Sequence, residues 1–175
     1  MTIDERLERY LGQTPQTDHA AFIAPDAVVL GDVVLGEKSS LWYGAIVRAD
    51  INQIRIGAGT NLQDGTIVHL ADDAGVEVGD FTTVGHRAIL HACTVGNECL
   101  IGMGATILDH AEIGDCSIIG ANSLVPQRMK IPAGSLVYGN PARIIRTLSP
   151  EEQKTIRRWA EKYIHVAAGH ATANR

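Results

Sequence analysis

The sequence lacks the features that would indicate a membrane, secreted or nucleic-acid-binding protein. It contains no run of about eighteen apolar residues, so no membrane span is expected. Its first six residues include three charged side chains and no apolar core of a signal peptide, which favours a cytoplasmic or organellar location. Fifteen basic against twenty acidic residues give a formal net charge of −5 without a basic tract, so nucleic-acid binding has no electrostatic support.

Cysteine is also scarce. There are three cysteines, an odd number, and no CxxC spacing, which gives no support for paired-cysteine chemistry. What the chain does have is 175 residues with 45% hydrophobic content, enough for one domain with a sizeable core.

The dominant feature is a six-residue repeat. An aliphatic residue, here called an anchor, recurs from Ile23 to Val137, and a glycine often follows it. A small or β-branched residue stands two positions before most anchors. The spacing is interrupted after Val47 and after Val68, and it shortens to five residues after Leu90. The anchors are Ile23, Val29, Leu35, Leu41, Val47, Ile56, Leu62, Val68, Val78, Val84, Leu90, Val95, Ile101, Ile107, Ile113, Ile119, Val125, Ile131 and Val137.

A hexapeptide repeat of this kind is typical of a β-helix. Because alternate residues of a strand face the same side, each anchor and the small residue two before it both point inward. Three short strands then form one triangular coil, and we predict an all-β fold, a parallel β-helix over residues 21–142. An ordinary sandwich of short strands would not keep a six-residue phase for so long. Cys93 and Cys99 fall in the small inward slot as buried thiols, whereas Cys116 lies off that slot and is expected to be partly exposed.

The two ends fall outside the repeat. Residues 1–20 are expected to be an irregular lead-in that caps the first coil. Ser149, Pro150 and Glu152 form a helix-start pattern, with serine as N-cap, proline at N1 and glutamate at N3. We predict a helical region over residues 143–168, packed on the outside of the coil or on a neighbouring subunit, and a flexible tail over 169–175. The predicted helix carries an apolar stripe at helical spacing, formed by Ile156, Trp159, Ala160, Tyr163, Ile164 and Ala167.

Three histidines follow the repeat in a way that suggests a metal site. His69 and His91 each follow an anchor directly. These two anchors are three anchors apart in the repeat, which corresponds to one full coil. Stacked strands lie about 4.8 Å apart, close enough for two imidazoles to reach one metal. His86 belongs to a different edge of the triangle, so we expect it to join the other two from a neighbouring chain of a threefold assembly. Among the remaining histidines, His110 lies in a turn beyond His91.

Polar residues gather in the preceding coils, where they break the pattern of anchor and glycine. Arg48 and Asp50 follow the anchor Val47. Asn61, Gln63 and Asp64 surround the anchor Leu62. These side chains could orient the histidines or hydrogen-bond a metal-bound water, as residues around metal ligands do. Alternatively, Arg48 could simply form intersubunit ion pairs with Asp50 or Asp64.

Several segments together resemble the gamma-class carbonic anhydrase family, from about residue 20 to residue 165. The resemblance implies a left-handed β-helix that forms a homotrimer, with zinc, or alternatively iron(II) or cobalt, bound by His69, His86 and His91 at the subunit interface. It further implies that Gln63 contacts the metal-bound hydroxide or bicarbonate, and that Arg48 and Asp50 form an interfacial network. Tyr138 resembles a tyrosine found near the site in some members. The matching segments are Arg48–Asp50, Thr60–Asp64, Val68–His69, Val84–His91 and Gly139–Ala142.

The chemistry that this resemblance implies is reversible hydration of CO2 to bicarbonate. A divalent metal lowers the pKa of bound water to about 7, which gives a hydroxide able to attack CO2. Two departures from the family pattern imply low activity. Ile51 stands where the archetypal enzyme carries a glutamate, and the short loop 70–75 lacks the proton-shuttle glutamate, for which Asp72 or Asp73 could substitute.

Three other functions remain open at this point. A metal-dependent acyl-CoA thioesterase would use the same hydroxide on a different carbonyl. A hexapeptide acyltransferase would need a single catalytic histidine and no metal. A non-catalytic trimeric scaffold would keep the metal as a structural clip.

Overall fold

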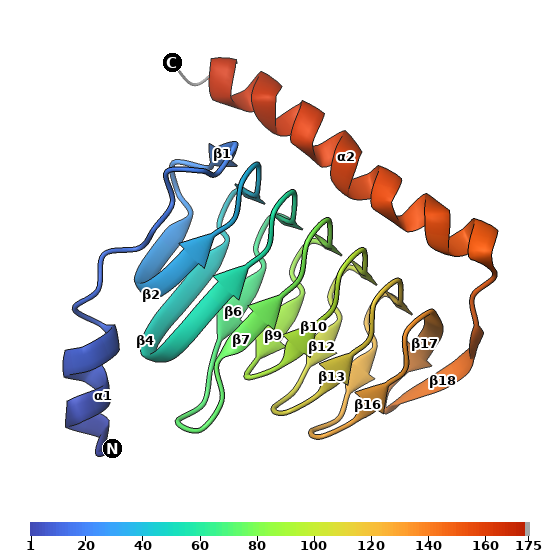
Figure 1. Cartoon of the computed structure of the whole chain (residues 1–175), viewed down its shortest axis with the longest axis horizontal. Helices are drawn as coiled ribbons and strands as arrows, with labels where there is room; N and C mark the ends of the chain where they lie inside the picture. Colours follow the sequence, from blue (N-terminus) through green and yellow to red (C-terminus); the bar gives the residue numbers. More distant parts are fainter. Residues whose placement is uncertain (174–175) are drawn as a thin grey trace.

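The computed structural model describes residues 1–173, which form a parallel β-helix with a helix at each end (Figure 1). Short strands of successive coils pair in parallel and build three walls, here called walls I, II and III. The predicted fold class, a parallel β-helix of hexapeptide repeats with a C-terminal α-helix, is therefore confirmed.

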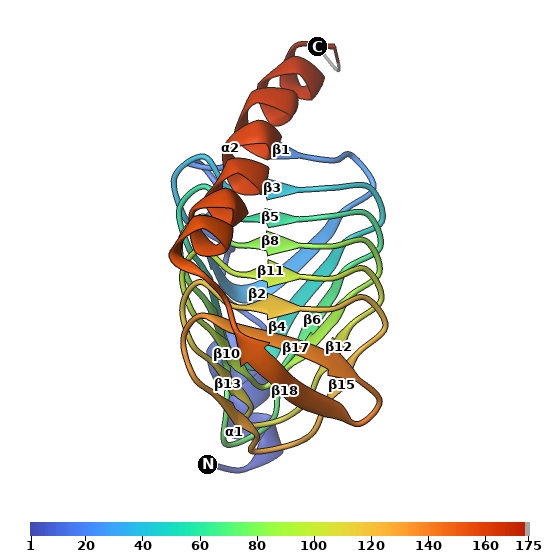
Figure 2. The ribbon, with the colours of Figure 1, turned by 90° about the vertical axis from the view of Figure 1, so that its right-hand side faces the viewer.

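Wall I is one continuous sheet, visible edge to edge in Figure 2. It ends in an antiparallel pair, in which β18 (Ala142–Thr147) returns along β17 (Ser135–Gly139). The other strands of wall I, in spatial order, are β1 (Phe22–Ile23), β3 (Ser40–Leu41), β5 (Asn61–Leu62), β8 (Thr83–Val84), β11 (Leu100–Ile101) and β14 (Ile118–Ile119).

Walls II and III are joined because two long strands, β2 (Val28–Leu35) and β4 (Ile46–Ile56), run through both. Strand β4 pairs with wall II through its first residues and with wall III through its last. Wall II continues with β6 (Ile67–His69), β9 (Ile89–His91), β12 (Thr106–Ile107) and β15 (Leu124–Val125). Wall III continues with β7 (Val76–Val78), β10 (Thr94–Val95), β13 (Glu112–Ile113) and β16 (Lys130–Ile131).

The core is a column of aliphatic side chains inside the coils. Every anchor from Leu35 to Val137 is at most 3% exposed, while the first two, Ile23 and Val29, are half-buried at the open end. Cys93 and Cys99 are buried in the small inward slot and Cys116 is partly exposed, as predicted. The interior thus follows the six-residue phase read from the sequence.

Both interruptions of the repeat lie at one corner, between walls II and III. After Val47 the chain continues as the long strand β4, and after Val68 it leaves wall II at His69 and forms the loop 70–75. Figure 1 shows this loop projecting from the stack below β6. The corner that carries His69 is therefore the one where the coil is widened.

Residues 1–20 were expected to be an irregular lead-in, but part of this segment is helical. Residues Ile3–Tyr10 form helix α1, because Thr2 and Glu5 make a capping box in which each side chain bonds the other's backbone N–H. Helix α1 lies against β4, and Arg6 Nη1 donates to the carbonyl of Ile51 at 3.3 Å.

The C-terminal expectation was wrong at both boundaries. Residues 143–147 belong to strand β18, and helix α2 runs from Pro150 to Ala173, well into the predicted tail. The helix continues because its last turns are packed: Ala167 is fully buried, and the ring of His170 lies 4.9 Å from that of Trp42. Residues 174–175 of the predicted tail lie outside the described part. Among residues 1–173, no helix is long and apolar enough to cross a membrane.

Candidate metal centre

His69 and His91 lie one above the other at the corner of walls II and III. Strands β6 and β9 pair in parallel in a register that places His69 opposite His91, which confirms the predicted stacking. His69 Nδ1 lies 3.3 Å from His91 Nε2. Two ring nitrogens therefore face each other at the surface of one chain.

Each of these rings presents its other nitrogen to a carboxylate. His69 Nε2 lies 3.2 Å from Asp50 Oδ1, and His91 Nδ1 lies 2.6 Å from Asp109 Oδ1. An ionised carboxylate only accepts hydrogen bonds, so the nitrogen that faces it carries the proton in the neutral ring. The facing nitrogens, His69 Nδ1 and His91 Nε2, are then the two with free lone pairs.

The local charges favour this protonation pattern. Asp50 is partly buried, which opposes its ionisation, but hydrogen bonds from His69 and Arg48 outweigh burial and lower the pKa of this carboxyl. Burial, together with the charge of Arg48, lowers the pKa of His69 and so keeps that ring neutral. Neutral imidazole beside ionised carboxylate is the state in which histidine binds a metal.

His86 lies at a different corner, between walls I and II. Its Nδ1 lies 2.8 Å from Asp64 Oδ2, so this ring too has one nitrogen held by a carboxylate, and Nε2 is left for another partner. Within residues 1–173 of a single chain, no three histidine, cysteine, aspartate or glutamate side chains converge on a common point. His86 thus does not join His69 and His91 in the same chain.

The residues fit a divalent metal such as zinc. Two nitrogens each about 2.0–2.1 Å from a tetrahedral zinc ion are about 3.3 Å apart, which is the separation of His69 Nδ1 and His91 Nε2. Three imidazoles, each oriented by a carboxylate, are also a typical donor set for zinc that leaves a fourth position open. Two of the three predicted ligands are already positioned for a metal within one chain.

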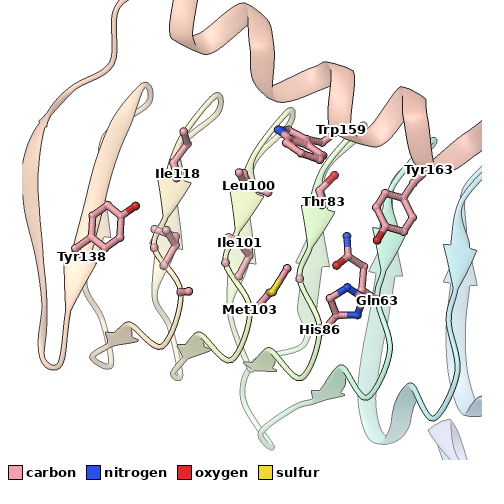
Figure 3. A pocket seen from close by; sticks show the side chains of 15 residues that line it. Gln63, Thr83, His86, Leu100, Ile101, Met103, Ile118, Tyr138, Trp159 and Tyr163 are labelled. Atoms are coloured by element: carbon pink, nitrogen blue, oxygen red, sulfur yellow. The ribbon is translucent and has the colours of Figure 1, made fainter.

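Among the other predicted residues, Asn61 and Tyr138 lie in strands of wall I and Gln63 directly follows β5, whereas Arg48 lies in β4. Gln63 and Asn61 are almost fully buried; Gln63 Nε2 donates to Asn61 Oδ1 at 3.2 Å, and Asn61 Nδ2 donates to Thr83 Oγ1 at 3.0 Å. Figure 3 shows Gln63 beside His86 and Tyr138 farther along the same wall, separated from both by Ile118 and Leu100. Gln63 and His86 are therefore neighbours, while Tyr138 is not part of that cluster.

Gln63, His86 and Tyr138 line a groove of about 300 Å³ between wall I and helix α2. One end carries Gln63 and His86, whereas the rest is lined mainly by aliphatic and aromatic side chains, including Met103 and Trp159 (Figure 3). The groove is much larger than a CO2 molecule needs.

Asp109, the partner of His91, is a site residue that the sequence pattern alone did not indicate. A signal for it exists, because each histidine has its carboxylate about one coil away: Asp109 is 18 residues after His91, and Asp50 is 19 residues before His69. A search for acidic residues one coil from each histidine would have found it.

Fold and geometry together define a hexapeptide-repeat β-helix protein with a histidine–carboxylate centre at its surface. Residues 92–127 match the family model described as bacterial transferase hexapeptide (six repeats). The chain is 41% identical over 98% of its length to gamma carbonic anhydrase 2, mitochondrial, of Arabidopsis thaliana, and spans 66% of that protein. It is 42% identical over 89% of its length to carbonic anhydrase of Geobacillus kaustophilus, of which it spans 85%.

A solved hexapeptide transferase family protein from Anaplasma phagocytophilum superposes with a TM-score of 0.86 at 40% identity, covering 90% of this chain and 93% of the other. The chain belongs to the gamma carbonic anhydrase-like family of hexapeptide-repeat proteins.

Proposed function

We propose that this protein is a metal-dependent carbonic anhydrase-like enzyme that hydrates CO2 reversibly to bicarbonate. The observation that carries the proposal is the pair of lone-pair nitrogens 3.3 Å apart, His69 Nδ1 and His91 Nε2, each in a ring oriented by a carboxylate. A zinc, iron(II) or cobalt ion bound there would supply a Lewis acid and a water of lowered pKa, about 7.

The remaining roles fall to the chain's own residues. Asp50 and Asp109 hold the rings of His69 and His91 in the neutral tautomers required of ligands. Gln63, fixed by its hydrogen bond to Asn61, presents a buried amide beside His86 that is suited to hold the oxygen atoms of bicarbonate. Arg48, which is ion-paired with Asp50, places a positive charge near an anionic product.

We infer a homotrimer in which His86 of one chain completes the centre of the next. The two histidine corners flank wall II, whose outer face carries an exposed apolar column. If wall II faces a threefold axis, this column is buried and the corner of walls I and II meets the neighbour's corner of walls II and III. The column comprises Val28, Ile46, Ile67 and Ile89, which are 37–49% exposed.

The test is metal content and CO2 hydration, measured on protein prepared without oxygen and loaded with zinc or iron(II). Wild-type protein should bind about one ion per chain and hydrate CO2, and His91→Ala should lose both properties while keeping the β-helix. Metal-loaded wild-type protein that is inert in stopped-flow hydration would contradict the proposal.

A second candidate is hydrolysis of an acyl thioester at the same centre. The observation in its favour is the apolar groove of about 300 Å³ that ends at His86 and Gln63, which would accommodate a short acyl chain. A panel of CoA thioesters assayed beside CO2 separates the two functions, because thioester turnover without CO2 hydration would favour this candidate.

A further inference from the structure

His110 is a histidine that the candidate metal centre does not use. Its Nε2 lies 3.3 Å from Asp73 Oδ2, so an imidazole and a carboxylate pair at the corner of walls II and III. The side chain of Asp73 is 72% exposed and that of His110 is 33% exposed. The pair therefore faces solvent.

Both members of this pair come from segments that also carry candidate ligands. The backbone N–H of His110 donates to the carbonyl of Ala92, the residue after His91, at 2.7 Å. The residue before His110 is Asp109, which accepts the hydrogen bond from His91. On the other side, Asp73 is four residues beyond His69 in the loop 70–75. The pair therefore links two segments that lie next to the candidate ligands.

The loop does not depend on this pair for its position. Leu70 is 1% exposed and fixes the start of the loop in the core. Asn52 Nδ2 donates to the carbonyls of Ala71 and Asp72, each at 3.2 Å. An exposed ion pair adds only about 0–1 kcal/mol to stability. Substitution at His110 or Asp73 should therefore leave the fold intact.

A cleft of about 240 Å³ adjoins His110 on wall III. At about 30 Å³ per molecule it has room for about eight waters, which can carry protons between the imidazole and bulk solvent. Besides His110, the ionisable residues that line this cleft are Glu77, Glu112 and the buried Cys93.

We propose that His110, paired with Asp73, is the relay residue that carries the proton of CO2 hydration to solvent; this inference rests on the proposed function. Hydration converts CO2 and H2O into HCO3− and H+, so one proton must leave for each turnover. Neutral His110 directs Nε2–H to Asp73 and takes up the proton at Nδ1. The resulting imidazolium, stabilised by the Asp73 carboxylate, passes the proton to a buffer base in the solvent.

The experiment compares His110→Ala and Asp73→Asn with His165→Ala, an exposed helix histidine, as the matched control. In ¹⁸O exchange on metal-loaded protein, interconversion of CO2 and bicarbonate should stay at the wild-type rate in all variants. Proton-limited release of labelled water, and kcat, should fall at least about tenfold in His110→Ala and less in Asp73→Asn. Added imidazole should restore most of the lost rate.

A second readout does not require turnover. In metal-free protein, ¹⁵N NMR of the neutral His110 ring should show its proton on Nε2, facing Asp73, and Asp73→Asn should weaken that preference. A ring that carries its proton on Nδ1, an unchanged kcat, or an equal loss of interconversion and proton release would each overturn the relay. Wild-type protein that is inactive toward CO2 would overturn the proposed function together with the relay, whereas an active wild type with a normal His110→Ala overturns the relay alone.

Discussion

His69 Nδ1 and His91 Nε2 face each other at 3.3 Å, on rings whose other nitrogens are held by Asp50 and Asp109. Two lone pairs directed at each other repel unless a cation or a shared proton lies between them. The parallel register of β6 and β9 and the two carboxylates together enforce this arrangement, so the β-helix itself positions two of the three proposed ligands.

Removing the carboxylate behind His91 should weaken metal binding without abolishing it. Asp109→Asn leaves the His91 ring in place but loses the partner that fixes its tautomer, so zinc affinity should fall about 10–100-fold. Competition with a chelator measures the change. Asp26→Asn, at an exposed turn, is the control and should bind zinc as the wild type does. Equal affinities for Asp109→Asn and wild type would refute the assigned role.

The buried thiols predict a loss of stability at high pH. Burial raises the pKa of Cys93 and of Cys99 from 9.0 to about 12. As pH rises, the thiols therefore lose their protons in the unfolded chain before they do in the folded chain. The contribution of the buried thiols to stability is fully present below pH 9 and is lost as pH rises from about 9 to 12. The loss is at most about 1.4 kcal/mol per pH unit and thiol.

Urea unfolding between pH 7 and pH 10.5 measures this effect. The double variant Cys93→Ala and Cys99→Ala places alanine in slots where the repeat already uses Ala88 and Ala105, and it should lose less stability above pH 9. Parallel pH profiles for the variant and the wild type would show that these thiols do not contribute.

The start of helix α2 should depend on its cap. Ser149 Oγ accepts from the N–H of Glu152 at 3.2 Å, and Glu152 Oε2 accepts from the N–H of Ser149 at 2.8 Å. Ser149→Ala should therefore cost about 1 kcal/mol in the free energy of unfolding, whereas Ser149→Asp should keep most of it. Chemical denaturation distinguishes them, and equal losses in the two variants would exclude the cap as the cause.

Gly31 should be irreplaceable because it supports the segment that carries Asp50. Its φ is +81°, and an added Cβ would lie 2.0 Å from the carbonyl oxygen of Ala49. Gly31→Ala should cost at least about 2 kcal/mol and, by moving Asp50, weaken zinc binding. Gly169→Ala is the control, since its Cβ would meet nothing within 4 Å, and it should be neutral or slightly stabilising. Comparable stability of the two variants would contradict this interpretation.

Periodicity made most of the fold predictable. The six-residue phase identifies which residues point inward. Counting anchors along the repeat places His69 over His91, as the strand register shows. The structure of the two ends of the chain was harder to predict because the six-residue repeat does not extend into them. Strand β18 forms by antiparallel pairing with β17, and the last turns of α2 are stabilised by His170 packing on Trp42, contacts between residues distant in sequence.

The candidate site was predictable in its histidines but not in its surroundings. The repeat gives each residue a corner, which is enough to separate His86 from His69 and His91. It does not show which turn residues reach across to the next coil, and so Asp109 and the contact between Asp73 and His110 appear only in three dimensions.

The central claim is that one metal is held by His69 and His91 of one chain and His86 of the next. Neither His86→Ala nor His91→Ala should bind metal well alone. When the two variants are coexpressed in equal amounts, an intact site should form wherever the His69 and His91 of a His86→Ala chain meet the His86 of a His91→Ala chain. In random trimers this condition holds for about one quarter of all sites.

Metal content per chain in the purified mixed trimers is the decisive measurement. Each mixed trimer contains one intact site, so we expect about 0.33 ions per chain in this fraction, with CO2 hydration regained in proportion. Mixed trimers with no more metal than either variant alone would contradict a centre shared between subunits.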